Sequence, residues 1–180
     1  MAKIGGTTPG REPFSPQRIN TKTGVARDQA SFSMASRERK QDALGEGQQP
    51  PSPSILIVED EPLIAAYIKE VLEESGFSVA GVASTGPEAI AVATAEPPDL
   101  ALVDIKLAGP MDGIEVAQLM HSRFNVRSIF LSGVCDPATM ERARAAAPLG
   151  FLEKPFRPSQ VFNALQRAFG DLLPQVQAGS

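Results

Sequence analysis

Five polar residues stand where short apolar runs of the sequence end: the acidic pair Glu59 and Asp60, a further aspartate, Asp104, then Ser132 and Lys154. If these positions meet in the fold, three carboxylates lie together, and their repulsion raises their pKa values unless a cation neutralises them. Oxygen ligands with room for water suit Mg²⁺, whereas zinc prefers cysteine and histidine clusters, which a sequence with one Cys and one His lacks. The residue types therefore predict a magnesium site.

The serine and the lysine add what a phosphoryl group needs beside a metal. Lys154 supplies a fixed positive charge and Ser132 a hydroxyl donor, while a carboxylate can act as a nucleophile towards phosphorus. Taken singly, an Asp or Glu after a strand is more often a helix cap or a solvated loop residue. The prediction of phosphoryl chemistry therefore depends on the joint placement of all five residues.

The elements that must position these residues alternate between strands and helices. Ile55–Val58 is a continuous apolar run, as in a strand covered by helices on both faces, and an amphipathic helix runs from Pro62 until Gly76 caps it. The further predicted strands are Phe77–Ala83, Leu100–Val103, Ser128–Leu131 and Gly150–Leu152. Four further helices are predicted. The first is Gly86–Ala95, and the third begins at Pro137, with Asp136 as its N-cap, and runs through Ala147. The second carries the apolar residues Val116, Leu119, Met120 and Phe124, and the last carries Val161, Phe162, Leu165, Phe169 and Leu172.

Five strands that alternate with five helices predict an α/β fold with a doubly wound, parallel sheet. Right-handed crossovers in such a sheet leave the ligand site at the carboxyl ends of the strands. All five polar residues stand at those ends. The topology therefore predicts that they converge.

Composition and charge exclude several classes of protein. No apolar run approaches the length of a membrane helix, and the single Cys135 and the lack of a secretion signal predict a cytoplasmic protein. Residues 1–53 carry a net charge of +3, with 8 Lys/Arg against 5 Asp/Glu, whereas the rest carries −7. An acidic folded part argues against direct binding of nucleic acid, which needs clustered Lys and Arg.

The chain divides into three parts by composition. Residues 1–53 are rich in Gly, Pro, Ser, Gln and Arg without an apolar period, which predicts a disordered N-terminal extension. Residues 54–173 contain the alternating strands and helices and form the predicted domain. Residues 174–180 are left as a short C-terminal tail.

Five short motifs run through the predicted domain in a fixed order. They are Ile57-Val58-Glu59-Asp60-Glu61, Leu102-Val103-Asp104, Met111-Asp112-Gly113, Phe130-Leu131-Ser132-Gly133 and Lys154-Pro155-Phe156. In this order and spacing, residues 54–173 resemble the receiver domain of response regulators in two-component signalling, such as the single-domain chemotaxis receivers. The resemblance implies a flavodoxin-like fold with strand order 2-1-3-4-5.

The resemblance also implies a role for individual residues at the metal site. It makes Asp104 the phosphoacceptor and a metal ligand. Asp60 becomes a direct Mg²⁺ ligand, and Glu59 acts on the metal through water. The backbone carbonyl of Lys106, two residues after the phosphoacceptor, is a further implied ligand.

Three further residues take implied roles in catalysis and switching, with Lys154 in the first and Phe151 in the second. Ser132 is the hydroxyl that moves to meet the phosphoryl group, and Lys154 is the cation that pairs with it, with a cis peptide bond to Pro155. Phe151 takes the place of the aromatic side chain that turns inward on activation. A phenylalanine in a strand is also an ordinary core residue, so both readings of Phe151 stay open.

The resemblance implies a stand-alone phosphoprotein that accepts a phosphoryl group on Asp104 and signals through a conformational switch. It is not a dedicated enzyme, although it dephosphorylates itself. The donor is a phosphohistidine on a histidine kinase or histidine phosphotransfer protein, and phosphorylation shifts a conformational equilibrium. An unknown output protein reads the surface of the helix that begins at Pro137, the strand Gly150–Leu152 and the last helix. Homodimerisation through the same surface stays open.

Two other functions compete with this one. An aspartyl-phosphate hydrolase or phosphotransferase needs a substrate pocket, and about 120 folded residues show no insertion to build one. A receiver-like interaction module that works without phosphorylation has no physical need for the acidic cluster.

The chain also departs from the family pattern in the loop after Asp104. The loop Ile105–Gly113 is one residue longer than the commonest spacing. Lys106 and Val134 occupy variable positions that, in this family, influence acyl-phosphate hydrolysis.

Overall fold

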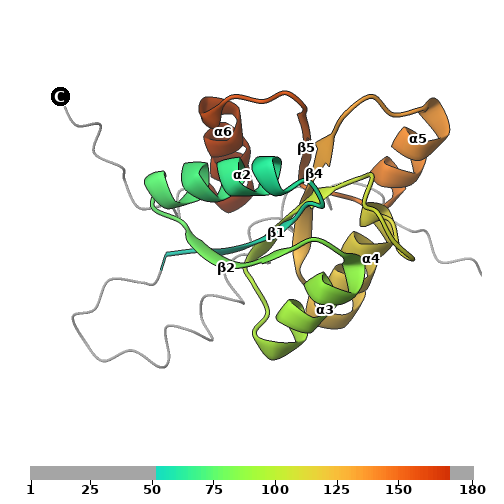
Figure 1. The fold of residues 1–180 in the computed structure, drawn as a ribbon, viewed down its shortest axis with the longest axis horizontal. Coiled ribbons are helices and arrows are strands. Elements are labelled where there is room, and N and C mark those ends of the chain that lie inside the picture. The colour runs from blue at the N-terminus through green and yellow to red at the C-terminus, as the bar shows by residue number, and fades with distance from the viewer. Residues whose placement is uncertain (1–51, 171–180) are drawn as a thin grey trace, which may run out of the picture.

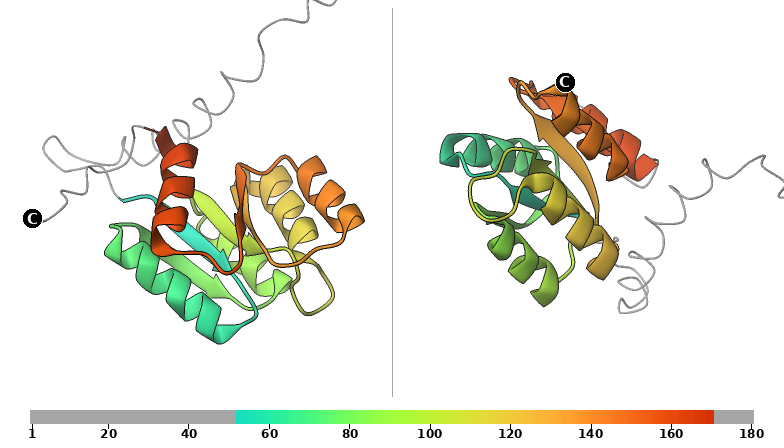
Figure 2. Two further views of the ribbon diagram at one scale, coloured as in Figure 1. Left: turned by 90° about the horizontal axis from the view of Figure 1, so that it is seen from above. Right: turned by 90° about the vertical axis from the view of Figure 1, so that its right-hand side faces the viewer.

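The computed structural model describes residues 52–170, which form a parallel sheet between two layers of helices (Figures 1 and 2). The predicted extension 1–53, apart from residues 52 and 53, and the predicted tail 174–180 lie outside the described residues, as does Leu172. The strands are β1 (Ser54–Val58), β2 (Ser78–Ala83), β3 (Leu100–Asp104), β4 (Arg127–Ser132) and β5 (Gly150–Glu153). The helices are α2 (Pro62–Glu74), α3 (Gly86–Ala95), α4 (Gly113–Phe124), α5 (Pro137–Ala145) and α6 (Pro158–Phe169).

The strand order is β2-β1-β3-β4-β5, and every pair of neighbours is parallel. This confirms the predicted doubly wound fold and its order. Because the order reverses between β1 and β3, their carboxyl ends border the crevice in which ligands of such sheets bind. Registers such as Val58 opposite Val103 and Asp104 opposite Leu131 bring the ends of the central strands level with one another.

Two apolar clusters explain why both faces of the sheet are covered. One face packs against α2 and α6, with Ile57, Leu102 and Leu165 in its centre, and the other packs against α3, α4 and α5, with Val103 and Phe130 in its centre. The four residues Ile55–Val58 are completely buried, as expected for a strand covered on both sides. Burial of each large aliphatic side chain contributes roughly 1.5–3 kcal/mol. The well-packed centre of the sheet therefore supports the residues at the carboxyl ends of its strands.

The helix boundaries follow the capping signals of the sequence. Asp136 caps α5 by accepting a hydrogen bond of 2.9 Å from the backbone N–H of Thr139, with Pro137 as the first helical residue. Helix α5 ends at Ala145, two residues before the predicted end, and Ala147 adopts a left-handed φ of 50° beyond it. Arg127, the first residue of β4, donates a hydrogen bond of 2.7 Å to the carbonyl of Ala147 in this turn before β5.

None of the helices formed by residues 52–170 is long and apolar enough to cross a membrane.

Candidate functional site

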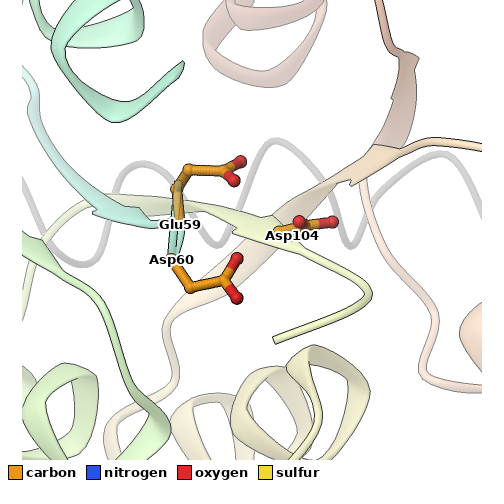
Figure 3. A group of neighbouring side chains, drawn as sticks. All are labelled: Glu59, Asp60 and Asp104. Carbon is orange, nitrogen blue, oxygen red and sulfur yellow. The ribbon is translucent and has the colours of Figure 1, made fainter. Parts of the chain in front are cut away.

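Three carboxylates meet at the carboxyl ends of β1 and β3. Glu59 and Asp60 directly follow β1, and Asp104 is the last residue of β3. One carboxylate oxygen from each lies within 4.8 Å of one from each of the others. Figure 3 shows the side chains of Glu59 and Asp60 extending from the end of β1 towards the side of Asp104. The structure therefore brings together the acidic residues that the sequence placed at separate strand ends.

Lys154 joins this group from the end of β5. Its ammonium lies 2.7 Å from Glu59 Oε2 and donates a hydrogen bond of 2.9 Å to Asp104 Oδ2. Its backbone N–H donates to the carbonyl of Ser132 over 2.7 Å, which ties the ends of β4 and β5 together. The peptide bond between Lys154 and Pro155 is cis, as predicted. The lysine thus contacts two of the three carboxylates directly.

The charges in this group are unbalanced, because one ammonium faces three carboxylates. Burial raises the pKa of Glu59 above its ordinary value, and the charge of Asp104 adds to the shift, while the hydrogen bond and charge of Lys154 oppose it. Burial alone would lower the pKa of Lys154, but hydrogen bonds to Glu59 and Asp104 outweigh it and the pKa lies above its ordinary value. The lysine therefore stays protonated, and the surplus negative charge favours a further cation.

The donor set fits Mg²⁺. Glu59 is only 1% exposed, and its Oε2 atom has the ammonium of Lys154 at 2.7 Å as its partner, while its Oε1 atom accepts a long hydrogen bond of 3.3 Å from the backbone N–H of Glu61. Asp60 is half-buried and accepts a long hydrogen bond of 3.2 Å from the N–H of Ala108. Clustered carboxylate oxygens of this kind are the usual protein ligands of Mg²⁺. The individual ligand roles, including that of the Lys106 carbonyl, stay predictions.

Within residues 52–170, neither of the two predicted switch residues, Ser132 and Phe151, forms a hydrogen bond with the three carboxylates. Ser132 is the last residue of β4, and its hydroxyl donates to the carbonyl of Gly133 over 3.1 Å; among the hydrogen bonds of residues 52–170, none joins it to Asp104. Phe151 is 37% exposed on β5, with its ring 5.8 Å from that of Phe130. In this conformation Phe151 therefore points outward, not into the core, and its switch role stays a prediction.

Two structural roles within the motif Met111-Asp112-Gly113, one for Asp112 and one for Gly113, were not predicted from the sequence. Asp112 caps α4 in a reciprocal capping box with Glu115, over two hydrogen bonds of 2.9 Å, and the spacing Asp-x-x-Glu was a readable signal for it. Gly113 lies so close to Asp104 that a Cβ atom would overlap the Asp104 carbonyl oxygen. No sequence signal distinguishes this close packing from an ordinary loop glycine.

The raised pKa of Glu59 predicts that stabilisation by Mg²⁺ depends on pH. In metal-free protein, the contribution of Glu59 to the free energy of unfolding is greatest below its unfolded value of about 4.5 and is lost as the pH rises through the higher folded pKa. Mg²⁺ competes with that proton, so the increase in unfolding midpoint that Mg²⁺ causes at neutral pH should vanish as the pH falls through the folded pKa. Thermal unfolding with and without Mg²⁺ across this range measures the effect.

The matched variant for this prediction is Glu59→Gln. The amide keeps the size and an acceptor oxygen but not the charge, so Mg²⁺ should bind roughly 10- to 100-fold more weakly. An unchanged Mg²⁺ affinity in Glu59→Gln would show that this carboxylate does not act on the metal.

Comparison with known proteins agrees with this geometry. The sequence model of one protein family, the response regulator receiver domain, matches residues 55–166 of this chain. The chain is similar to the transcriptional regulatory protein PdtaR of Mycobacterium tuberculosis, with 35% identity over 114 residues, which cover 63% of this chain and 55% of that protein. It is 32% identical over 114 residues to the chemotaxis protein CheY of Thermotoga maritima, and the match covers 63% of this chain and 94% of CheY.

A solved structure gives the same result for the fold. The signal receiver domain of a modulated diguanylate cyclase from Desulfovibrio desulfuricans G20 superimposes with a TM-score of 0.63 at 38% identity, covering 66% of this chain and 94% of that one. The chain spans only about half the length of PdtaR. A family model that matches most of the folded residues, with the acidic cluster at the expected strand ends, settles the classification. The chain belongs to the response regulator receiver domain family.

Proposed function

We propose that this chain accepts a phosphoryl group on Asp104 from a phosphohistidine on a histidine kinase or histidine phosphotransfer protein. The observation that carries the proposal is the environment of Asp104: a carboxylate that is 6% exposed, with an ammonium at 2.9 Å and two further carboxylates beside it. An Asp104 carboxylate oxygen forms a bond to phosphorus while the P–N bond of the donor breaks, and the histidine ring leaves with the electron pair.

The residues around Asp104 have separate tasks in this reaction. Lys154, already in contact with Asp104 Oδ2, stabilises negative charge on the phosphoryl oxygens. Glu59, Asp60 and Asp104 would hold Mg²⁺, which when bound neutralises charge on the transferring group. The backbone N–H of Lys106 donates over 3.2 Å to Asp104 Oδ1, which fixes the orientation of the carboxylate. The nucleophile is therefore oriented before the donor arrives.

Phosphorylation would then act as a conformational switch. The new charge and acceptor oxygens on Asp104 favour a state in which the hydroxyl of Ser132 leaves Gly133 and meets the phosphoryl group. We propose that an output protein, or a second copy of the chain, reads α5, β5 and α6, where Phe151 is exposed. Hydrolysis of the acyl phosphate by the chain itself would end the signal.

A cytoplasmic location belongs to the same proposal, because a chain with one cysteine forms no internal disulfide of the kind used in oxidising compartments.

The experiment that tests this function is incubation of the full chain with Mg²⁺ and a small phosphodonor such as acetyl phosphate. We expect one phosphoryl group per chain, dependent on Mg²⁺, stable in acid and labile in alkali. Continuous release of phosphate from small phosphate esters would instead indicate a hydrolase. A chain that takes up no phosphoryl group, and whose NMR spectrum does not respond to Mg²⁺ with beryllofluoride, would be an interaction module.

The rim of the site predicts how a protein donor docks. Leu63, at the start of α2, is 86% exposed and lies three residues after Asp60. Beside it, Tyr67 and Phe156 stack with ring centroids 6.2 Å apart and line a cavity of about 370 Å³ that also reaches Lys154. An exposed apolar side chain in the first turn of the helix that follows the acidic pair is suited to contact a donor protein, and truncating such a contact costs roughly 1–2 kcal/mol, or about tenfold.

Leu63→Ala is therefore expected to lower kcat/KM for phosphotransfer from a phosphohistidine protein about tenfold, with the rate from acetyl phosphate unchanged. The matched control is Val82→Ala, which shortens a side chain that is 47% exposed on β2. Equal rates for the Leu63 and Val82 variants with the protein donor would place the docking surface elsewhere.

A further inference from the structure

Helix α5 is held to the sheet by few apolar contacts. Of its nine residues only Ala143 is fully buried, and its other apolar contacts come from half-buried residues such as Met140. The neighbouring α4, by contrast, buries five residues: Gly113, Ile114, Val116, Ala117 and Met120. Elements with few buried apolar contacts are those that open or shift most readily. Polar contacts therefore have a large share in fixing the position of α5.

Two such contacts join the chain after Asp104 to the chain after Ser132. Arg142 of α5 forms an ion pair of 2.8 Å with Asp112, the N-cap of α4, and both side chains are partly exposed, at 54% and 31%. The ammonium of Lys106 donates a hydrogen bond of 2.7 Å to the carbonyl of Val134, in the loop that leads into α5. We call these two contacts the straps.

The straps coincide with an arrangement in which the serine is turned away from the phosphoacceptor. The hydroxyl of Ser132 contacts the carbonyl of Gly133 at 3.1 Å and the sulfur of Met140 at 3.9 Å. For this hydroxyl to reach a phosphoryl group on Asp104, both of these contacts have to be given up. A shift of the loop and of α5 that allows this would stretch the contacts made by Lys106 and Arg142.

We propose that Arg142 and Lys106 hold the loop after β4 and α5 in the unphosphorylated position, so that switching has to loosen both straps. The proposal rests on the proposed function, since it concerns the equilibrium that phosphorylation shifts. A contact made only in one of two states lowers the apparent affinity of any ligand that binds the other state. Removing a strap should therefore tighten the binding of a phosphoryl analogue.

The test is a titration of the full chain with beryllofluoride in saturating Mg²⁺, followed by NMR. Loss of a partly exposed ion pair predicts that Arg142→Gln binds roughly two- to fivefold more tightly than the wild type. Its free-state signals from the loop and α5 should also move towards their beryllofluoride-bound positions. The matched control is Arg144→Gln on the same helix, whose arginine reaches only Glu141 at 4.0 Å. This control should bind like the wild type or slightly more weakly.

The direction of the effect separates the strap from simple electrostatics. Losing a positive charge near an anion site weakens anion binding through Coulomb interaction alone, and both arginine variants lose the same charge. Tighter binding by Arg142→Gln, but not by Arg144→Gln, therefore supports the strap. Equal or weaker binding by Arg142→Gln relative to Arg144→Gln overturns it for this residue.

Two further variants test the partners of the straps. Asp112→Asn keeps an N-cap acceptor for α4 but loses the charge that pairs with Arg142, so adding Arg142→Gln to it should tighten binding no further. Lys106→Met keeps the aliphatic chain without the donor and should bind roughly two- to fivefold more tightly. Fully additive effects, or weaker binding by Lys106→Met, contradict the proposal. If the wild type itself shows no response to beryllofluoride, the proposed function fails. If the wild type responds but the strap variants bind as it does, only the strap proposal fails.

Discussion

Asp104→Asn is expected to take up no phosphoryl group from acetyl phosphate or from a phosphohistidine protein, while it folds as the wild type does. The amide is a far weaker nucleophile than the carboxylate, and Asp104 is the carboxylate that hydrogen bonds from Lys154 and from the backbone N–H of Lys106 hold in place at the end of β3. The amide oxygen still accepts from Lys154, so the fold should be retained. Intact-protein mass spectrometry after acid quenching measures the loss.

The matched control is Asp136→Asn. It removes the same charge from a loop at the same edge of the sheet, and an asparagine caps α5 as well as the aspartate does. This variant should be phosphorylated like the wild type. If Asp104→Asn still gains one phosphoryl group per chain, the nucleophile is another residue, and Asp60 is the first to examine because it is half-buried in the same cluster.

The response to Mg²⁺ adds a second readout for the same variant. Asp104→Asn leaves two carboxylates, Glu59 and Asp60, in place of three, so Mg²⁺ affinity should fall while some binding persists. The variant also removes the charge of Asp104 that helps to raise the pKa of Glu59, so Glu59 should titrate at a lower pH than in the wild type. Carboxyl NMR signals of Glu59 can report this shift independently of phosphorylation.

The fold was predictable from the sequence because each local signal pointed to the same element. The short continuous apolar run Ile55–Val58 favoured a strand buried on both faces, and Asp136-Pro137 indicated the start of α5 through its cap. The predicted ends of β3 and β4 differ from those in the structure because pairing with neighbouring strands decides where these strands end. Asp104 and Ser132 are the last residues of their strands because their backbones still pair with Leu131 and Glu153 of the neighbouring strands. Propensity alone gives no sign of that pairing.

The convergence of the acidic residues was predictable for a topological reason. The carboxyl ends of parallel strands lie at one end of the sheet, so residues at the ends of the neighbouring strands β1 and β3 lie close together, and the long side chain of Lys154 reaches them from the end of β5. The detailed contacts were not predictable in the same way. That Lys154 contacts Glu59 more closely than Asp104, at 2.7 against 2.9 Å, depends on rotamers within the site.

Phe151 and the straps show the limit of sequence reasoning most clearly. A phenylalanine in a strand looked equally suited to the core and to a switch, and only the position of β5 at the edge of the sheet explains its 37% exposure. The ion pair between Arg142 and Asp112 joins residues 30 positions apart with no pattern to connect them. Contacts between loops follow from how helices settle on the sheet, which no local periodicity encodes.

Gly113→Ala is expected to lower both the stability of the protein and its rate of phosphorylation. A Cβ atom at this position would overlap the carbonyl oxygen of Asp104, and it would lie 2.8 Å from the carbonyl carbon and 3.1 Å from Val103 Cγ1. Backbone atoms cannot swing aside as a side chain can, so either α4 or the end of β3 must move. Overpacking of this kind should cost about 3 kcal/mol or more, and a shift of about 1 Å in the nucleophile can slow a reaction about 100-fold.

Two glycine variants separate these effects. Gly150→Ala adds a methyl group where no atom lies within 4 Å, and it should change neither property. Gly86→Ala meets the side chains of Val116 and Met111, at 2.8 and 3.1 Å, so it should lose roughly 1–3 kcal/mol of stability with little loss of phosphorylation rate. Denaturant unfolding and acetyl phosphate labelling of the three variants measure both quantities. If Gly113→Ala loses stability but is labelled as fast as Gly86→Ala, the glycine serves packing alone; a selective loss of rate shows that the start of α4 sets the position of the phosphoacceptor.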